Sequence, residues 1–208
     1  LLGRQSSASL YSSEARSEHV VPNVVQTAQF ILRITLIVVA AATVLVAVVL
    51  LVIGMEPARA WTQALWLSIS GFVTGGLAPM AQSVLYYHCA PLEFVLMVLM
   101  IMGSTSFVLH SELWRGHIMP FFHDIETRTM FLWIAVMTIV FTAALAATQL
   151  FSDLPTLLRR GLFMVVSSFS TTGFQVITSN QLNTVLSSGA FLSLALLMSV
   201  GGATDSTA

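Results

Sequence analysis

Charged residues are scarce in this chain of 208 residues: they make up 8% of it, against 56% hydrophobic residues, and the formal net charge is −1. The mean hydropathy is +0.88. Soluble domains usually contain about 25% charged residues, so this composition excludes a soluble globular protein and indicates a membrane protein. The near-zero net charge also gives no sign of a nucleic-acid partner, which would require a basic surface.

Cysteine is almost absent as well, since Cys89 is the single one in the sequence. One cysteine excludes an internal disulfide framework and a cysteine-based metal site. The sequence also shows no grouping of nucleophile, general base and metal-binding residues. We therefore expect no enzyme, no transition-metal site and no bound cofactor.

Long apolar runs are present in place of charge. Residues 34–53 form twenty consecutive residues without a charge, enough to cross a hydrocarbon layer of about 30 Å as a helix. Three further apolar stretches, each bounded by polar or charged residues, cover 94–109, 130–151 and roughly 182–203. The pattern predicts four spanning helices.

Two shorter segments lie between these runs, "EPARAWTQALWLSISGFVTGGLAP" at 56–79 and "SDLPTLLRRGLFMVVSSFSTTGFQ" at 152–175. Both are too short and polar to span a membrane, yet too apolar for ordinary loops. Each begins with an acid and a proline, continues as a helix of about fifteen residues, and ends in a small polar cluster with glycine. Asp153 is expected to cap the second helix, with Pro155 in its first turn.

The two halves of the chain repeat with an offset of 97 residues. The chain therefore reads as two parallel units, each made of a span, a short helix, a Thr/Gly cluster and a second span. The predicted boundaries are an N-terminal segment at 1–29, a first unit at 30–113, a linker at 114–127 and a second unit at 128–208. The matched pairs are Ser70 and Ser167, Phe72 and Phe169, Thr74 and Thr171, and Gly76 and Gly173.

The Thr/Gly clusters predict an ion path. Non-helical backbone at membrane depth is tolerated only where it is buried in protein or lines a water-filled path. Extended Thr–Thr–Gly–Phe backbone can present a row of carbonyl oxygens that replaces the hydration shell of a monovalent cation. A short helix that ends at the same place directs its partially negative C-terminus there. Both features favour a cation.

The chain resembles the Trk/Ktr superfamily of potassium transporters over nearly its whole length. The resemblance rests on "LYSSEA" at 10–15, "TGGLAP" at 74–79, "MIMGSTSFVLHSELWRG" at 100–116, "ETRTMFLW" at 126–133, "VSSFSTTGF" at 166–174 and "SVGGATDSTA" at 199–208. It implies an all-α membrane protein with two tandem span–pore helix–span units and re-entrant filter loops, corresponding to the second and third units of a four-unit pore.

The resemblance also implies site residues. Backbone carbonyls of the two filter loops would bind potassium, which is the substrate, and a Gly-rich gate loop would interrupt the last span. The ion-binding residues would be Thr171, Thr172, Gly173 and Phe174, together with Thr74, Gly75, Gly76 and Leu77. The gate loop would comprise Gly201, Gly202, Ala203, Thr204, Asp205, Ser206 and Thr207. Leu77 stands where the family usually carries Phe, and Asp205 where many members have Gly.

The expected setting follows from the same resemblance. The chain opens on Leu1 and stops inside the gate motif, so it reads as a fragment, and its partners would be the missing pore units of the same parent chain. A homodimer, the lipid bilayer and a cytoplasmic nucleotide-binding regulatory subunit are the other expected partners. The expected location is the plasma (inner) membrane, as a multi-pass protein with its N-terminus in the cytoplasm, an orientation that the distribution of arginines weakly favours.

Two other functions stay open at this point. A membrane scaffold or assembly subunit would use the polar clusters to pack helices. A two-unit cation channel would reach four filter strands by dimerising. For Arg159 and Arg160, contact with lipid headgroups is favoured over repulsion of cations or pairing with Asp153.

Overall fold

The computed structural model describes residues 24–114, 116, 124–147, 153–178, 181 and 190–206. Within these residues every regular element is a helix, which confirms the expected all-α class for that part of the chain. The elements are α2 (Val24–Val52), α3 (Pro57–Phe72), the 3₁₀ helix η1 (Ser83–Tyr87), α4 (Ala90–Ser104), α5 (Phe107–Trp114), α7 (Ile125–Ala147), α8 (Leu154–Phe169) and α10 (Ala190–Ser206).

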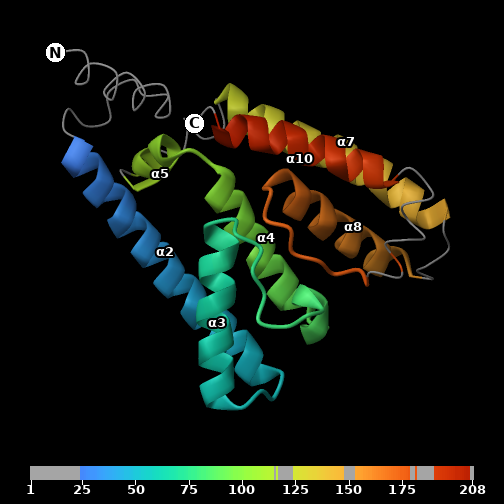
Figure 1. Ribbon diagram of the computed structural model, residues 1–208, viewed down its shortest axis with the longest axis horizontal. Coiled ribbons are helices and arrows are strands. Elements are labelled where there is room, and N and C mark those ends of the chain that lie inside the picture. Colours follow the sequence, from blue (N-terminus) through green and yellow to red (C-terminus); the bar gives the residue numbers. More distant parts are fainter. Residues whose placement is uncertain are drawn as a thin grey trace.

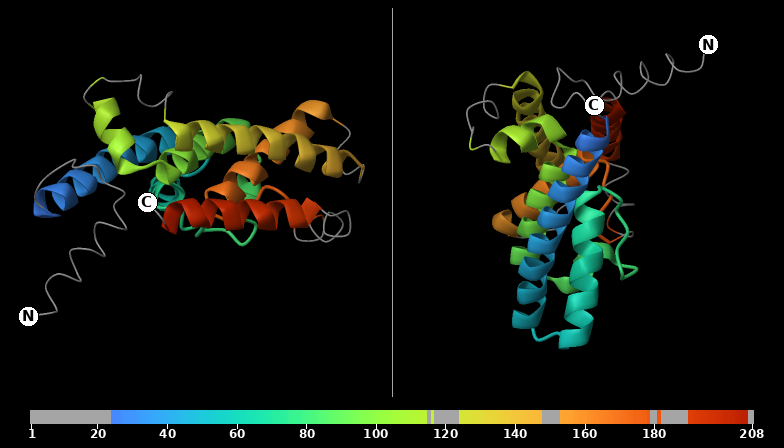
Figure 2. Two further views of the ribbon diagram at one scale, coloured as in Figure 1. Left: turned by 90° about the horizontal axis from the view of Figure 1, so that it is seen from above. Right: turned by 90° about the vertical axis from the view of Figure 1, so that its left-hand side faces the viewer.

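The larger helices form two groups of three. In the first group α2 packs against α3 and α4, and α3 also packs against α4; in the second, α7, α8 and α10 pack against one another. Figure 1 shows α4 in the middle of the molecule, and α4 contacts α8 of the other group. The right-hand view in Figure 2 shows α3 lying beside the C-terminal part of α2. The helix α3 therefore lies between α2 and α4, and α8 contacts α7, α10 and α4.

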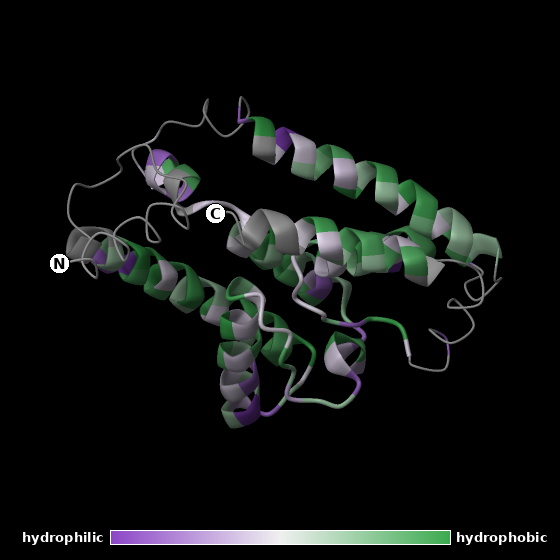
Figure 3. Cartoon of the chain, turned by 45° about the horizontal axis from the view of Figure 1, so that its top comes forward, coloured by the Kyte–Doolittle hydropathy of each residue, from purple (hydrophilic) through white to green (hydrophobic). Residues whose placement is uncertain are grey.

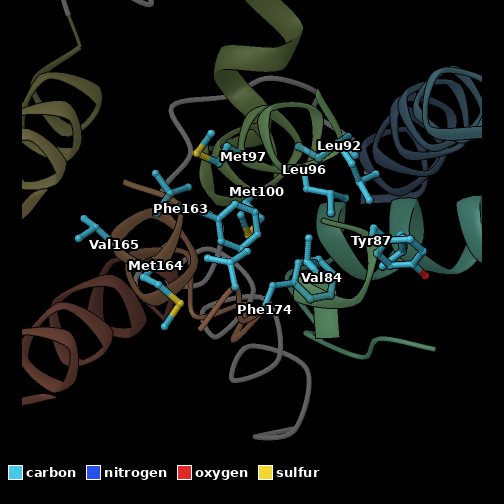
Figure 4. Close-up of a cluster of buried hydrophobic side chains, with 14 of the residues drawn as sticks. Val84, Tyr87, Leu92, Leu96, Met97, Met100, Phe163, Met164, Val165 and Phe174 are labelled. Carbon is cyan, nitrogen blue, oxygen red and sulfur yellow. The ribbon is translucent and has the colours of Figure 1, made fainter. Parts of the chain in front are cut away.

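One hydrophobic core runs through both groups. It includes Leu67 of α3, Leu96 and Met100 of α4, and Phe163 of α8, all of them fully buried. Figure 4 shows that side chains from both groups meet in the same cluster. Burial of apolar surface stabilises the folded state by about 25 cal/mol per Å². Because separating the two groups would expose this shared core, the core holds them together.

Large apolar side chains also cover the outside of the longest helices. Leu36 and Val48 of α2, and Leu132 and Ile139 of α7, are exposed, and Figure 3 shows hydrophobic residues along these helices. By length and composition, Ala28–Val52 and Thr127–Ala147 are able to cross a membrane. These two helices match the first and third predicted spans, although both begin earlier in the chain than predicted.

The second predicted span, residues 94–109, is not one continuous helix. The helix α4 ends at Ser104, and α5 begins at Phe107 after Thr105 adopts an extended conformation. The hydroxyls of Ser104 and Thr105 donate to the carbonyls of Ile101 and Met102, at 3.0 and 2.8 Å. Such local bonds can compete with the helical ladder. The helix is interrupted at this point, so the prediction of an unbroken span over 94–109 was wrong.

The fourth predicted span, roughly 182–203, is described only in part. Residues 182–189 lie outside the described residues, and α10 covers Ala190–Ser206. Within the described residues, α4 and the stretch Leu192–Gly201 are apolar but shorter than a full span.

Candidate functional site

The two short helices match each other in length and position. Both α3 and α8 contain 16 residues, and their first and last residues are offset by the 97 residues that the sequence repeat predicts. Both carry proline in the first turn, where its missing N–H group costs nothing. Asp153 occupies the N-cap position of α8, but its side chain makes no capping hydrogen bond, so the predicted capping role of this carboxylate was wrong.

Each short helix ends in the same backbone turn. The first loop (residues 73–77) follows α3, and the second loop (residues 170–174) follows α8. Thr74 and Thr171 have left-handed backbones with φ of 54° and 55°, which is uncommon for a β-branched residue. The hydroxyl of each donates to the carbonyl of the preceding residue at 2.7 Å. This left-handed conformation costs free energy for a threonine, yet it occurs at the same position of both loops. Both loops therefore require this backbone geometry.

A left-handed glycine follows in each loop, Gly76 with φ of 66° and Gly173 with φ of 83°. Backbone bonds also tie both loops to the helix ends: the N–H of Gly75 donates to the Ser70 carbonyl at 2.8 Å, and the N–H of Gly173 donates to the Ser167 carbonyl at 3.3 Å. The loops thus lie directly at the C-termini of α3 and α8, which carry partial negative charge.

The two loops touch each other. A Cβ atom on Gly76 would overlap the carbonyl oxygen of Thr172, so glycine alone permits this approach. Beyond the loops, Gln175 accepts a bond from the N–H of Leu85 at 3.1 Å and donates its own N–H to the Ser83 hydroxyl at 3.1 Å. The fold therefore brings together both predicted sets of loop residues, 74–77 and 171–174, although they are far apart in the sequence.

The segment after the first loop is also tied to α3. The Tyr87 hydroxyl donates to Oε1 of Gln63 at 2.9 Å, and both residues are buried. The pKa of Tyr87 is raised to about 12, mainly by burial and secondly by the neighbouring Tyr86. The phenol therefore stays protonated at neutral pH and keeps donating this bond.

A charged pair joins the two groups of helices. Nε of Arg159, on α8, lies 3.3 Å from a carboxylate oxygen of Glu93, which is buried at the start of α4. This pairing differs from all three roles considered for Arg159 from the sequence, and the favoured contact with lipid headgroups stays a prediction. Sequence reasoning also missed Glu93. An acid next to an apolar run was the available signal, but its partner is 66 residues away.

Two further glycines hold the following helices against the ends of α3 and α8. A Cβ atom on Gly103 of α4 would overlap the carbonyl oxygen of Phe72, and one on Gly201 of α10 would overlap the carbonyl oxygen of Phe169. Each contact lies within one unit and beside the start of its loop. Gly103 was not among the predicted site residues, and its offset from Gly201 differs by one residue from the repeat.

The predicted gate loop adopts helical backbone where it is described. Residues 201–206 form the last turns of α10, and Thr207 lies outside the described residues. Gly201 is buried beside the end of α8. A role for Gly201–Thr207 in gating stays a prediction.

No group of three or more His, Cys, Asp or Glu side chains able to hold a metal ion occurs among the described residues. The polar groups gathered at the two loops are backbone carbonyls, amides and hydroxyls. Carbonyl and hydroxyl oxygens are ligands for hard cations, so this arrangement is chemically able to bind a cation.

Known proteins resemble this chain over most of its length. It matches the TrkH family, described as a cation transport protein, over residues 1–208. It is 28% identical over 198 residues to the uncharacterized cation transporter MJ1485 of Methanocaldococcus jannaschii, covering 95% of this chain and 37% of that protein. It is 34% identical over 119 residues to the Trk system potassium uptake protein TrkH of Halomonas elongata, covering 56% of this chain and 24% of that protein.

The fold is also similar to that of a solved transporter. The potassium transporter TrkH from Vibrio parahaemolyticus matches with a TM-score of 0.67 and 20% identity, over 84% of this chain and 37% of that chain. In the residues that the structure describes, the fold defines a class, that of all-helical proteins with helices able to cross a membrane. Within that class, the chain belongs to the TrkH cation transport protein family, which confirms the resemblance found in the sequence. The chain spans 37% of the length of the Methanocaldococcus jannaschii and Vibrio parahaemolyticus proteins and 24% of the length of the Halomonas elongata protein.

Proposed function

We propose that this chain contributes two of the filter loops of a potassium-uptake pore. In this proposal the short helices α3 and α8 are pore helices that enter the membrane and end within it, and the loops after them are re-entrant. Potassium is the transported substrate and is bound by backbone carbonyl oxygens. The residues that supply them are Thr171, Thr172, Gly173 and Phe174 in the second loop and Thr74, Gly75, Gly76 and Leu77 in the first.

The observation that carries the proposal is the meeting of two equivalent loops. A Thr/Gly cluster could pack helices when it occurs once. Here two clusters have matching backbone turns and lie against each other at Gly76 and Thr172. A scaffold that only packs helices has no need of two left-handed threonines at one place, because this conformation costs free energy.

The chemistry of the two loops suits a weakly hydrated monovalent cation. Neutral carbonyl dipoles replace the hydration shell of potassium without binding it so tightly that it cannot leave. The C-termini of α3 and α8 add partial negative charge from two directions. The printed names of the relatives, a cation transporter and a potassium uptake protein, agree with this substrate.

The remaining parts of the proposal concern the surroundings of the pore. The other filter loops come from further pore units of a longer chain, and the assembly is a homodimer in the plasma membrane, with the N-terminus in the cytoplasm. A nucleotide-binding regulatory subunit contacts the cytoplasmic face, and residues Gly201–Thr207 gate the path. No bound cofactor takes part.

A growth experiment separates this function from the two alternatives. The full-length transporter should restore growth of potassium-uptake-deficient cells at limiting potassium, whereas residues 1–208 alone should not, because two loops leave the ion path open. Membrane levels of both proteins are matched by immunoblot. Rescue by residues 1–208 alone would favour the dimerising two-unit channel. No rescue by a full-length protein that accumulates normally would favour the scaffold.

A further inference from the structure

The two loops are equivalent in backbone but not in the way they are held. In the second loop, the Ser167 hydroxyl donates to the carbonyl oxygen of Phe174 at 2.8 Å, and this bond is buried. It runs from the last turn of α8 to the far end of the loop and closes it into a ring. The Phe174 carbonyl is therefore fixed in direction, with one lone pair accepting the Ser167 hydroxyl and only the other left for an ion.

Two more hydroxyl contacts brace the second loop from inside. The Ser170 hydroxyl donates to the Ser167 carbonyl at 3.3 Å and lies 2.7 Å from the hydroxyl of Thr172. All three residues are buried. Buried hydrogen bonds in a low-dielectric setting reinforce one another, so these contacts stiffen the backbone that carries the proposed ion ligands.

The side chain of Phe174 anchors the same loop in the other unit. It is 1% exposed, and Figure 4 shows it inside the buried cluster with Leu96, Met100 and Phe163. A Cβ atom built on Gly71 of α3 would lie 3.6 Å from its ring. The second loop is thus held by its own helix and also by the helix of the first unit.

The first loop lacks each of these supports. Ser70 is the counterpart of Ser167, yet its buried hydroxyl has no hydrogen-bond partner among the described residues. Val73 and Gly75 stand where the second loop has Ser170 and Thr172, so the hydroxyl contact between those two is impossible. Leu77, the counterpart of Phe174, is 67% exposed.

We propose that Ser167 is the positioning residue of the filter, and that ion discrimination depends on the braced second loop far more than on the first. This inference rests on the proposed carbonyl filter. A filter separates potassium from sodium by the number and field of its oxygens. A loop whose carbonyls are held in place preserves that arrangement, whereas a loop without the closing bond adjusts to the smaller ion.

The test compares the same substitution at two equivalent positions. Ser167→Ala and Ser70→Ala each remove one hydroxyl from the last turn of a pore helix. Rubidium and sodium fluxes are measured in proteoliposomes with matched amounts of folded full-length protein. We expect Ser167→Ala to lower the rubidium-to-sodium flux ratio by about three-fold or more, the effect of losing one buried hydrogen bond. We expect Ser70→Ala to leave the ratio at the parent value.

Equal effects of the two substitutions, or no effect of Ser167→Ala, would overturn the inference. If Ser167→Ala does not accumulate as folded protein, Thr172→Val serves instead, because it removes the contact with Ser170 and keeps the branched shape. An unchanged ratio in Thr172→Val would then be the contradicting result. Gly173→Ser separates this inference from the proposed function: if it lowers the ratio while Ser167→Ala does not, the filter stands and only the positioning role fails.

Discussion

Replacing Gly76 with alanine in the full-length transporter will lower rubidium uptake about ten-fold or more. The new Cβ atom would overlap the carbonyl oxygen of Thr172, which is backbone of the other loop and cannot rotate away as a side chain could. The left-handed φ of 66° adds strain to any residue with a Cβ. Both loops must separate, and the carbonyls that we propose as ligands lose their common arrangement.

Gly54→Ala is the matched control for this experiment. Gly54 also has a left-handed backbone, with φ of 93°, but no atom lies within 4 Å of the position that its Cβ would take. Both substitutions therefore introduce backbone strain, and only Gly76→Ala forces the loops apart. We expect initial uptake rates, per folded protein, to fall about ten-fold or more for Gly76→Ala and less than about two-fold for Gly54→Ala, since strain alone at a surface turn costs only about 1–2 kcal/mol of stability. Similar rates for both would contradict the account.

Replacing Gly103 or Gly201 with alanine will destabilise the protein strongly. Each Cβ atom would overlap the carbonyl oxygen of the last residue of a short helix, Phe72 or Phe169. Overpacking of a well-packed interior costs about 1–3 kcal/mol, and sometimes more. The outgoing helix must move away from the pore helix, so the start of the adjacent loop moves too and transport declines with stability.

The measurement is the apparent Tm of the full-length protein in detergent, at one scan rate because unfolding is often irreversible. Val98→Ala is the control, because Val98 lies on the same helix as Gly103 and is 41% exposed. We expect both glycine variants to melt several degrees below the parent and Val98→Ala to melt close to it. Parent-like melting of Gly103→Ala and Gly201→Ala would show that these contacts have no structural role.

The short helices could be predicted from the sequence because their signals are local. Proline in the first turn and Thr with Gly after the last turn mark the ends of α3 and α8. The same signals occur twice, 97 residues apart, so each copy supports the prediction made from the other. The left-handed Gly76 and Gly173 follow from the same signals, since glycine accepts conformations that other residues resist. Local chemistry repeated at a fixed offset was therefore sufficient for these elements.

Other features depend on tertiary contacts and could not be predicted. The pairing of Glu93 with Arg159 depends on how α4 packs against α8. The position of the Phe174 ring beside Gly71 depends on how the second loop packs against α3. The break after Ser104 also could not be predicted from hydropathy, because Ser and Thr occur within continuous apolar helices such as α7 as well. The unequal support of the two loops emerges only when both are seen together.

The most direct test of the carbonyl filter is the paired flux of rubidium and sodium through Gly173→Ser in the full-length transporter, with Gly54→Ser as control. Both glycines have left-handed backbones, with φ of 83° and 93°, and open space where the Cβ would lie. The two serines thus strain the backbone alike, but only Gly173 lies in one of the two proposed filter loops. If the loop binds the ion through its carbonyls, Gly173→Ser raises sodium flux relative to rubidium while Gly54→Ser keeps the parent ratio. A parent-like ratio in Gly173→Ser, with normal folding and membrane insertion, would contradict the carbonyl filter.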